Sequence, residues 1–371
     1  MAFESSELHT TWLRLPEGFP VDDLEVVGQQ LTDAGICIPG YLPPEMGLLS
    51  TAALCYEHAH GVQMVLLPDR NVVSRMAQLA AGETVVGNEQ RRLAAALLGL
   101  CQCHDIEIEP GAAFHELAHR EGNDVALNEL RLFRLADSAH AQETLDVALG
   151  RSPTLRLRPV DLPGPPDGDL SRPLRRWNRN YVIALRILEL EAKPLTPLQR
   201  VKELMDWMVS DFTFGAPGAL LAMVFLAPNS PPKKDVFKNR HSTDREAAIR
   251  GVRNAAWDLT QLSDFTAKVN AEGEEGQTRY LFATFDKHLR LQANLIFQYG
   301  TDLDSLSGLA DALSAWWPRN DAIALSDALR RHLERVHAPG WRREVSLTYE
   351  RVMELIRDGE ERVRRAVGRP D

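Results

Sequence analysis

The sequence contains little cysteine and no excess of positive charge. Its four cysteines, Cys37, Cys55, Cys101 and Cys103, include no C-x-x-C pair, which argues against the common cysteine-based zinc and redox sites. No apolar run is long enough to cross a bilayer, and the first residues lack the basic and apolar regions of a signal peptide. We therefore expect a cytoplasmic protein with reduced thiols and no membrane contact. The formal net charge of −10 argues against nonspecific coating of nucleic acid, but it is compatible with a nuclease whose acids cluster around a metal.

The pattern of apolar residues predicts an α/β fold. Hydrophobic residues make up 44% and charged residues 25% of the 371 residues, as in globular proteins with a buried core. Three short segments have the pattern of strands: residues 62–67, which end before Pro68, residues 106–109, and residues 279–284. Helical patterns separate them. Strands that alternate with helices predict a short parallel sheet flanked by helices.

The domain organisation is predicted from the same pattern. Residues 1–60 contain several prolines that interrupt any long element, so their fold is left unassigned. Residues 61–300 are expected to form the core, with a helical insertion at about 150–230, and residues 301–371 a helical C-terminal region. Within the core, Ser242 or Thr243 is expected to cap a long helix that ends near residue 270.

Four acids lie close to the predicted strands. Asp69 follows the first strand and Asp286 the third, whereas Glu116 and Asp258 lie on the helices after the second strand and before the third. Ligands of open α/β sheets bind beyond the carboxyl ends of the strands. Four carboxylates in one pocket repel one another unless a cation joins them, and Mg²⁺ or Mn²⁺ prefers such oxygen ligands. For any single acid a helix cap or a solvated surface position is the simpler explanation, so the prediction depends on all four together.

The order of these segments resembles the PIN-like domain, a family of metal-dependent ribonucleases. The resemblance covers roughly residues 60–145 and 200–295. Its motifs are matched by the strand that leads into Asp69 and Asn71, by Glu116 on a helix after a short strand, by Asp258 with Asp264 as a substitute, and by Thr284-Phe285-Asp286 after the last strand. The segment between the second and third motifs is much longer than in compact PIN domains.

The resemblance implies an endoribonuclease that hydrolyses RNA phosphodiesters with Mg²⁺ or Mn²⁺. Asp69, Glu116, Asp258 and Asp286 would hold the metal, and Asn71 or Thr284 would orient a carboxylate or a phosphate. The RNA backbone would contact the basic residues Lys233, Lys234, Lys238 and Arg240. A second basic patch consists of Arg172, Arg175, Arg176 and Arg179 around Trp177, although both patches equally fit solvated surfaces. The resemblance does not determine whether a protein partner inhibits the enzyme.

A competing motif occupies the same region. His115-Glu116-Leu117-Ala118-His119 is an HExxH sequence, which on a helix places two histidines for zinc and a glutamate as general base, as in metallopeptidases. Val125 stands where the metzincin extension needs a third histidine, and a zinc peptidase leaves Asp69 and Asp286 without a role. A third reading is a PIN-like binding module without catalysis.

Overall fold

The computed structural model describes residues 14–159, 161–162, 164, 168–230, 236–273, 276–299, 306–341 and 347–366. The strands are β1 (Cys37–Pro39), β2 (Gln63–Pro68), β3 (Glu107–Ile108) and β4 (Thr278–Ala283). The helices of the first half are α1 (Val21–Ala34), α2 (Thr51–Ala59), α3 (Arg70–Ala80), α4 (Glu89–His104), α5 (Gly111–Glu121), α6 (Asn123–Asp137) and α7 (Ala141–Ala148). Those of the second half are α8 (Arg175–Ala192), α9 (Pro197–Ser210), α10 (Ala216–Phe225), α12 (Arg245–Glu272), α13 (Lys287–Tyr299), α14 (Leu306–Leu313), α15 (Arg319–His337) and α16 (Tyr349–Arg365).

The strands form one mixed sheet in the order β1-β4-β2-β3. β2 is parallel to β3 and to β4, with Leu66 opposite both Ile108 and Leu281. The α/β class and the three predicted strands are therefore confirmed. The three predicted strands are parallel to one another, but the sheet as a whole is mixed, because a fourth strand, β1, joins the outer edge of β4 in the antiparallel direction. Its three residues are too few to produce a recognisable strand pattern, and the prolines around it hid the neighbouring helices as well.

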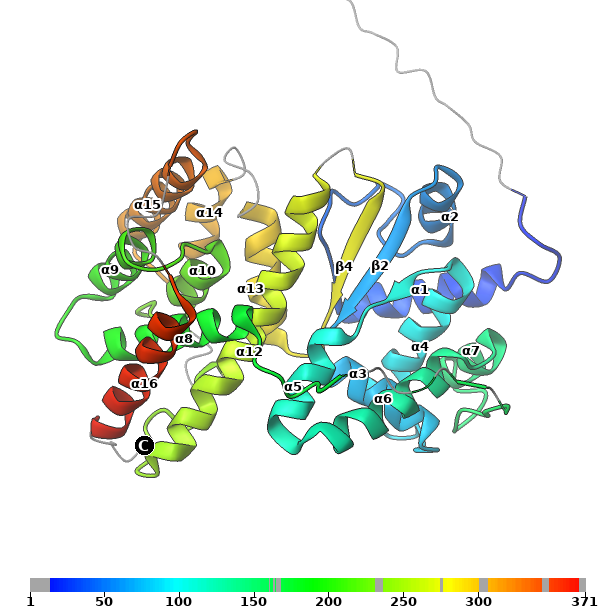
Figure 1. The fold of residues 1–371 in the computed structure, drawn as a ribbon. Coiled ribbons are helices and arrows are strands. Elements are labelled where there is room, and N and C mark those ends of the chain that lie inside the picture. Colours follow the sequence, from blue (N-terminus) through cyan, green and yellow to red (C-terminus); the bar gives the residue numbers. More distant parts are fainter. Residues whose placement is uncertain are drawn as a thin grey trace, which may run out of the picture.

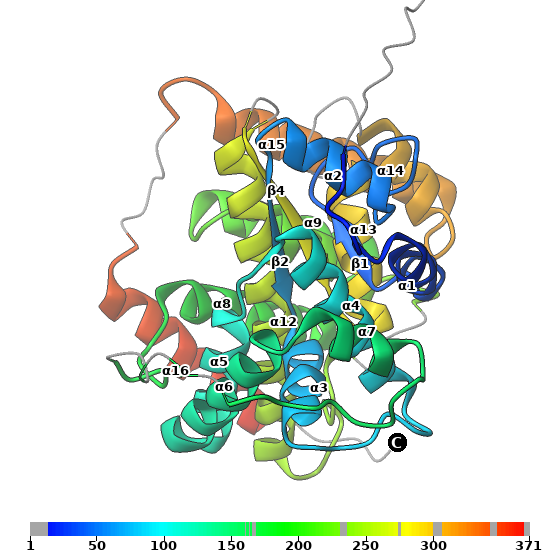
Figure 2. The ribbon, with the colours of Figure 1, turned by 90° about the vertical axis from the view of Figure 1, so that its right-hand side faces the viewer.

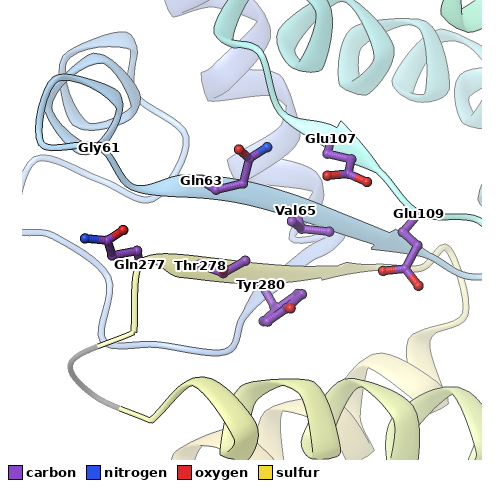
Figure 3. A pocket seen from close by; sticks show the side chains of 8 residues that line it. All are labelled: Gly61, Gln63, Val65, Glu107, Glu109, Gln277, Thr278 and Tyr280. Carbon is purple, nitrogen blue, oxygen red and sulfur yellow. The ribbon is translucent and has the colours of Figure 1, made fainter.

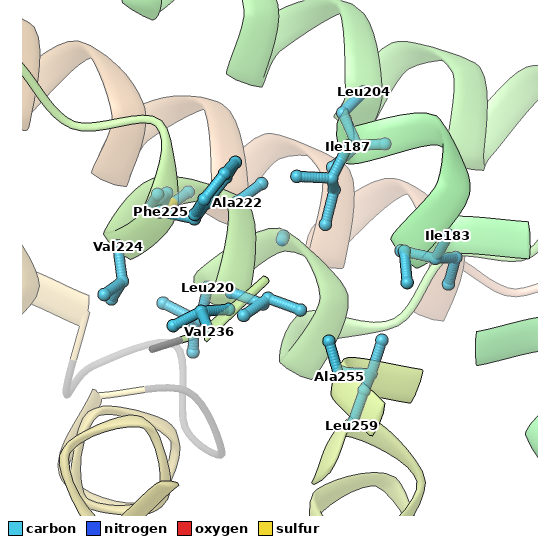
Figure 4. Close-up of a cluster of buried hydrophobic side chains, with 14 of the residues drawn as sticks. Ile183, Ile187, Leu204, Leu220, Ala222, Val224, Phe225, Val236, Ala255 and Leu259 are labelled. Carbon is cyan, nitrogen blue, oxygen red and sulfur yellow. The ribbon is translucent and has the colours of Figure 1, made fainter. Parts of the chain in front are cut away.

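The sheet separates two hydrophobic cores. Alternate residues of a strand face opposite sides, so Val65 and Leu67 of β2 join the core formed mainly by helices from α8 onward, whereas Met64 and Leu66 join the core of the earlier helices. Figures 1 and 2 show these two groups of helices on either side of β2 and β4. Figure 4 shows the first core, where apolar side chains of α8, α9, α10 and α12 meet, among them Ile187 of α8.

Helix α12 is the element that links the first core to the sheet. It begins after Asp244, whose side chain accepts a hydrogen bond from Glu246 N (3.0 Å), so the predicted cap at Ser242 or Thr243 was wrong. Gly251 allows the helix to pass close to the preceding loop, because a Cβ there would lie 1.8 Å from the carbonyl oxygen of Lys238. The helix packs against α8 and β4. None of the described helices combines the length and apolar character that a membrane span requires.

Candidate active site

The site is built where β2 and β4 end side by side. Pro68 pairs with Ala283 at the last position of the two strands, so the residues that follow them, Asp69 and Thr284, are brought together. Asp69 is 4% exposed and caps α3, with its Oδ1 accepting a hydrogen bond from Arg70 N (2.6 Å). The hydroxyl of fully buried Thr284 donates to Asp69 Oδ2 (2.8 Å). The parallel register thus joins residues that are more than two hundred positions apart in the chain.

Asn71 connects the start of α3 to the turn after β4. Its Nδ2 donates to Asp69 Oδ2, and its Oδ1 accepts a hydrogen bond from the backbone N–H of Phe285 (3.0 Å). Asp69 Oδ2 therefore has two side-chain donors, Asn71 and Thr284. These contacts hold the carboxylate in one orientation and leave little freedom for it to rotate.

Gln261 of α12 bridges two buried acids, a contact that the sequence analysis did not anticipate. Its Nε2 donates to Asp69 Oδ1 (2.9 Å) and to Glu116 Oε2 (3.2 Å). Gln261 is 3% exposed and Glu116 is 7% exposed, so the three side chains share a buried position between α3, α5 and α12. The sequence hints at Gln261 only through its position one helical turn after Asp258, on the same face, which does not distinguish it from an ordinary core residue.

Asp258 and Asp286 complete the acidic cluster without direct contact to the other two acids. Asp286 Oδ1 caps α13 by accepting hydrogen bonds from the backbone N–H groups of His288 (2.7 Å) and Leu289 (3.1 Å). The side chain of Asp258 makes no hydrogen bond or ion pair with another described residue. The charges of the other three acids nevertheless raise the pKa of Asp258, so these acids lie close to it.

The pKa values of three acids are raised. For Glu116, burial first and then the charge of Asp69 raise the pKa to about 7, against the smaller opposing charges of Arg70 and Arg120. Burial also raises the pKa of Asp69, and the charge of Asp286 adds to it. The pKa of Asp258 is raised well above its ordinary value by loss of hydration and by the charges of the other three acids. The cluster therefore holds more negative charge than its surroundings compensate, which favours bound protons or a bound cation.

The donor set fits a hard cation, although the side chains do not form a ready coordination shell. Among the described residues, no group of three His, Cys, Asp or Glu side chains is placed to hold a metal ion. Asp69 and Glu116 instead share the amide of Gln261, which lies between them. Carboxylates with hydroxyl and amide neighbours are the oxygen ligands that Mg²⁺ and Mn²⁺ prefer, and raised pKa values indicate missing positive charge.

The two histidines of the HExxH sequence make structural contacts. His115 Nδ1 lies 2.6 Å from the carbonyl oxygen of Leu170, and His119 Nε2 lies 3.0 Å from that of Arg172. Because a carbonyl only accepts, both ring nitrogens are donors here. Glu116 instead contacts Gln261, to which neither histidine is bonded. These contacts favour a structural role for the histidines over zinc ligation.

The basic residues predicted to contact RNA are distributed unevenly. Lys238 is exposed, and its charge lowers the pKa of Asp258, so it lies near the acidic cluster. Arg240 is held by an ion pair with Glu191 (3.4 Å) and lies over the ring of Phe225. Lys233 and Lys234 fall outside the described residues.

Asp264, the substitute for Asp258, pairs instead with Arg176 of the second basic patch (3.1 Å). It is not among the charges that raise the pKa of the clustered acids. Asp258 is therefore the α12 acid that belongs to the site.

A surface pocket of about 510 Å³ lies away from this cluster. It is bordered by the first residues of β2 and β4 and by Glu107 and Glu109, as Figure 3 shows. Glu109 is ion-paired with Lys268 of α12 (2.8 Å). Because Asp69 and Thr284 follow the opposite ends of the same strands, the pocket is separate from the acidic site.

Comparison of the chain with protein-family models, with curated proteins and with solved structures finds no match. The resemblance to the PIN-like family thus depends on the order of the motifs and on the residues that the fold brings together.

Proposed function

We propose that this chain is a divalent-metal-dependent endoribonuclease with a PIN-like core. The observation that carries the proposal is the buried Asp69–Gln261–Glu116 bridge at the carboxyl ends of two parallel strands, with Asp258 and Asp286 electrostatically coupled to it. Raised pKa values at a buried site are typical of functional acids. The proposal makes use of all four acids, whereas a zinc peptidase uses only Glu116.

Asp69, Glu116, Asp258 and Asp286 would hold Mg²⁺ or Mn²⁺. When bound, such an ion activates water and offsets the charge that develops on a phosphodiester. Thr284 and Asn71 fix the orientation of Asp69 through its Oδ2. Lys238, exposed near Asp258, is suited to attract a substrate phosphate.

Gln261 is the residue whose position must change in this proposal. Its amide donates to both buried acids in the metal-free state and thereby offsets part of their repulsion. A cation that binds the same oxygens competes with the amide. Gln261 would then turn toward the substrate or the remaining acid oxygens.

The test is cleavage of a mixed RNA pool with Mn²⁺ by purified variants. Asp69→Asn should lower the cleavage rate roughly a thousandfold or more, because it removes a metal-binding charge while the amide occupies the same space. Asp137→Asn, at the exposed end of α6, is the control: it makes the same chemical change, and none of the clustered acids contributes to the pKa of Asp137. It should cleave like the unmodified protein.

Three outcomes would overturn the proposal. Equal cleavage by the unmodified protein and Asp69→Asn would identify a contaminating nuclease. Stoichiometric zinc in the purified protein, lost on His115→Ala, would instead support the metallopeptidase. A folded protein that binds RNA without cutting any member of the pool would support the binding module.

A further inference from the structure

The loop before α8 is hydrogen-bonded to α5, which carries the HExxH sequence, and to the start of α6. His115 and His119 of α5 contact the carbonyl oxygens of Leu170 and Arg172, at 2.6 and 3.0 Å. The side chain of Asn123, at the start of α6, accepts a hydrogen bond from Leu170 N (2.8 Å). The histidines thus fix the direction in which the chain enters α8.

An aromatic cluster lies next to this fastening. The exposed ring of His119 is stacked on Trp177 of α8, with 5.9 Å between ring centroids and 24° between planes. Trp257 of α12 supports the same ring at 5.3 Å, and Trp177 stacks in turn on Tyr181 at 4.9 Å. One side of the His119 ring is therefore backed by indoles, while the residue stays accessible to solvent.

Three arginines flank Trp177 in the sequence and have no acidic partner among the described residues. Arg172 and Arg175 are exposed and Arg179 is partly exposed, and none of them forms an ion pair with a described residue. Asp169, the acid nearest in the chain to Arg172, accepts hydrogen bonds from Ser171 N (2.8 Å) and Oγ (2.6 Å) instead. In a chain with a formal net charge of −10, three arginines on one short segment, none paired with a described acid, are a local excess of positive charge.

The aromatic cluster and the three arginines together form one surface, which lies next to the acidic cluster. His119 is three residues after Glu116 on α5, and positions three apart share a helix face. Trp257 immediately precedes Asp258 on α12. The first turn of α8 is tied to the same helix, since Arg176 donates to the carbonyl oxygen of Ser263 (2.7 Å). Figures 1 and 2 show α5, α8 and α12 next to one another.

We propose that this surface binds single-stranded RNA, with phosphates on Arg172, Arg175 and Arg179 and one base stacked on the outer side of the His119 ring. The choice of ligand rests on the proposed nuclease function. Arginines recognise phosphates, and aromatic rings backed by other rings are stacking platforms for unpaired bases. Bases of a duplex are already stacked on each other, so a duplex offers no base to His119.

The first experiment measures the fluorescence anisotropy of a short labelled oligouridine in EDTA, where no metal-dependent cleavage occurs. The triple variant R172A/R175A/R179A should bind tenfold or more weakly, and the slope of log affinity against log salt should fall by about 2, at ~0.7 per phosphate contact. The control triple is R250A/R319A/R365A, which removes equally many exposed arginines, each ion-paired with an acid. It should bind within about twofold of the unmodified protein.

A second pair of variants separates stacking from the structural contact of His119. His119→Gln keeps a donor for the carbonyl oxygen of Arg172 but removes the ring, and should weaken oligouridine binding roughly 5- to 100-fold. His119→Phe keeps the ring without the donor and should restore most of the affinity. Duplex RNA should bind all three forms alike. The reverse order of the two variants would show that the fastening of the loop, and not stacking, matters.

These binding measurements test the surface separately from the proposed nuclease function. Three results would overturn the proposed RNA-binding role of this surface, whether or not the protein cleaves RNA. They are no binding of oligouridine, an equal loss of affinity in both triple variants, and tighter binding of duplex RNA than of oligouridine. Binding that depends on the arginines and on the His119 ring would support the proposed RNA-binding role. This would hold even if Asp69→Asn left cleavage unchanged and the proposed nuclease function were rejected.

Discussion

Glu116→Gln is expected to make the metal-free protein more stable at pH 8. The pKa of Glu116 is raised from 4.5 to about 7, mainly by burial and then by Asp69. At 1.36 kcal/mol for each pKa unit, this difference corresponds to roughly 3 kcal/mol. Glutamine has nearly the shape of the protonated acid and can still accept the hydrogen bond from Gln261. It removes the cost of a buried charge and leaves the packing intact.

The sign of the pH dependence follows from the two pKa values. Below about pH 4.5 the acid is protonated in the folded and the unfolded protein, so Glu116 and its glutamine variant should have similar free energies of unfolding. Between 4.5 and about 7 the unfolded chain loses its proton first, and the unmodified protein loses stability as the pH rises. Above about 7 the loss is complete.

The assay is urea denaturation in EDTA at several pH values between 4 and 8. The difference in free energy of unfolding between the variant and the unmodified protein should grow from near zero to about 3 kcal/mol in favour of the variant. Glu121→Gln, at an exposed position on the same helix, is the control and should change stability by less than about 0.5 kcal/mol. Parallel pH curves for Glu116→Gln and the unmodified protein would refute the reasoning, because they would show that Glu116 has an ordinary pKa.

Three further results are expected. Adding Mn²⁺ at pH 8 should raise the melting temperature of the unmodified protein more than that of Glu116→Gln, since the ion offsets the same charge; equal shifts would contradict a site at Glu116. Gln261→Leu should destabilise the protein in urea by about 1–3 kcal/mol at pH 8, because both buried acids lose a donor, and a loss equally large at pH 4 would show that packing is responsible. Gly251→Ala should lower the free energy of unfolding, measured by thermal denaturation, by about 1–3 kcal/mol, because the new Cβ would overlap the carbonyl oxygen of Lys238. Gly111→Ala is the control, and it should be nearly neutral because the space beside its Cα is open. An equal loss in both variants would contradict the close contact at Gly251.

The parts of the fold that were predictable are those with a local signal. A buried strand that ends at a proline, and a short apolar strand that precedes a Thr-x-Asp sequence, are visible in a few residues. Once β2 and β4 are assumed to be parallel, their carboxyl ends meet, and Asp69 must lie near Thr284. The antiparallel strand β1 was not predictable in this way, because three residues contain no measurable period.

Gln261 could not be found from motifs because its role is created by tertiary packing. Its hydrogen bonds reach residues 192 and 145 positions earlier in the chain. An uncharged amide carries no metal-ligand signature, and a buried glutamine on a helix is equally consistent with an ordinary core position. Only the docking of α12 against α3 and α5 makes it the shared donor of two acids.

The HExxH sequence shows why a local motif cannot select between two chemistries. Helical geometry places His115 and His119 on one face of α5, with Glu116 about 100° around the axis from His115 and about 60° from His119, whichever function the helix serves. The outcome depends on which face meets the sheet. Here Glu116 faces Asp69 through Gln261, and the histidines face the loop that leads into α8. A zinc site needs the histidines and a third ligand on the same side, whereas an acidic metal site needs only the glutamate to face the strand ends. The contacts of α5 therefore support the carboxylate chemistry and give the two histidines a different task, that of holding the arginine-bearing segment beside it.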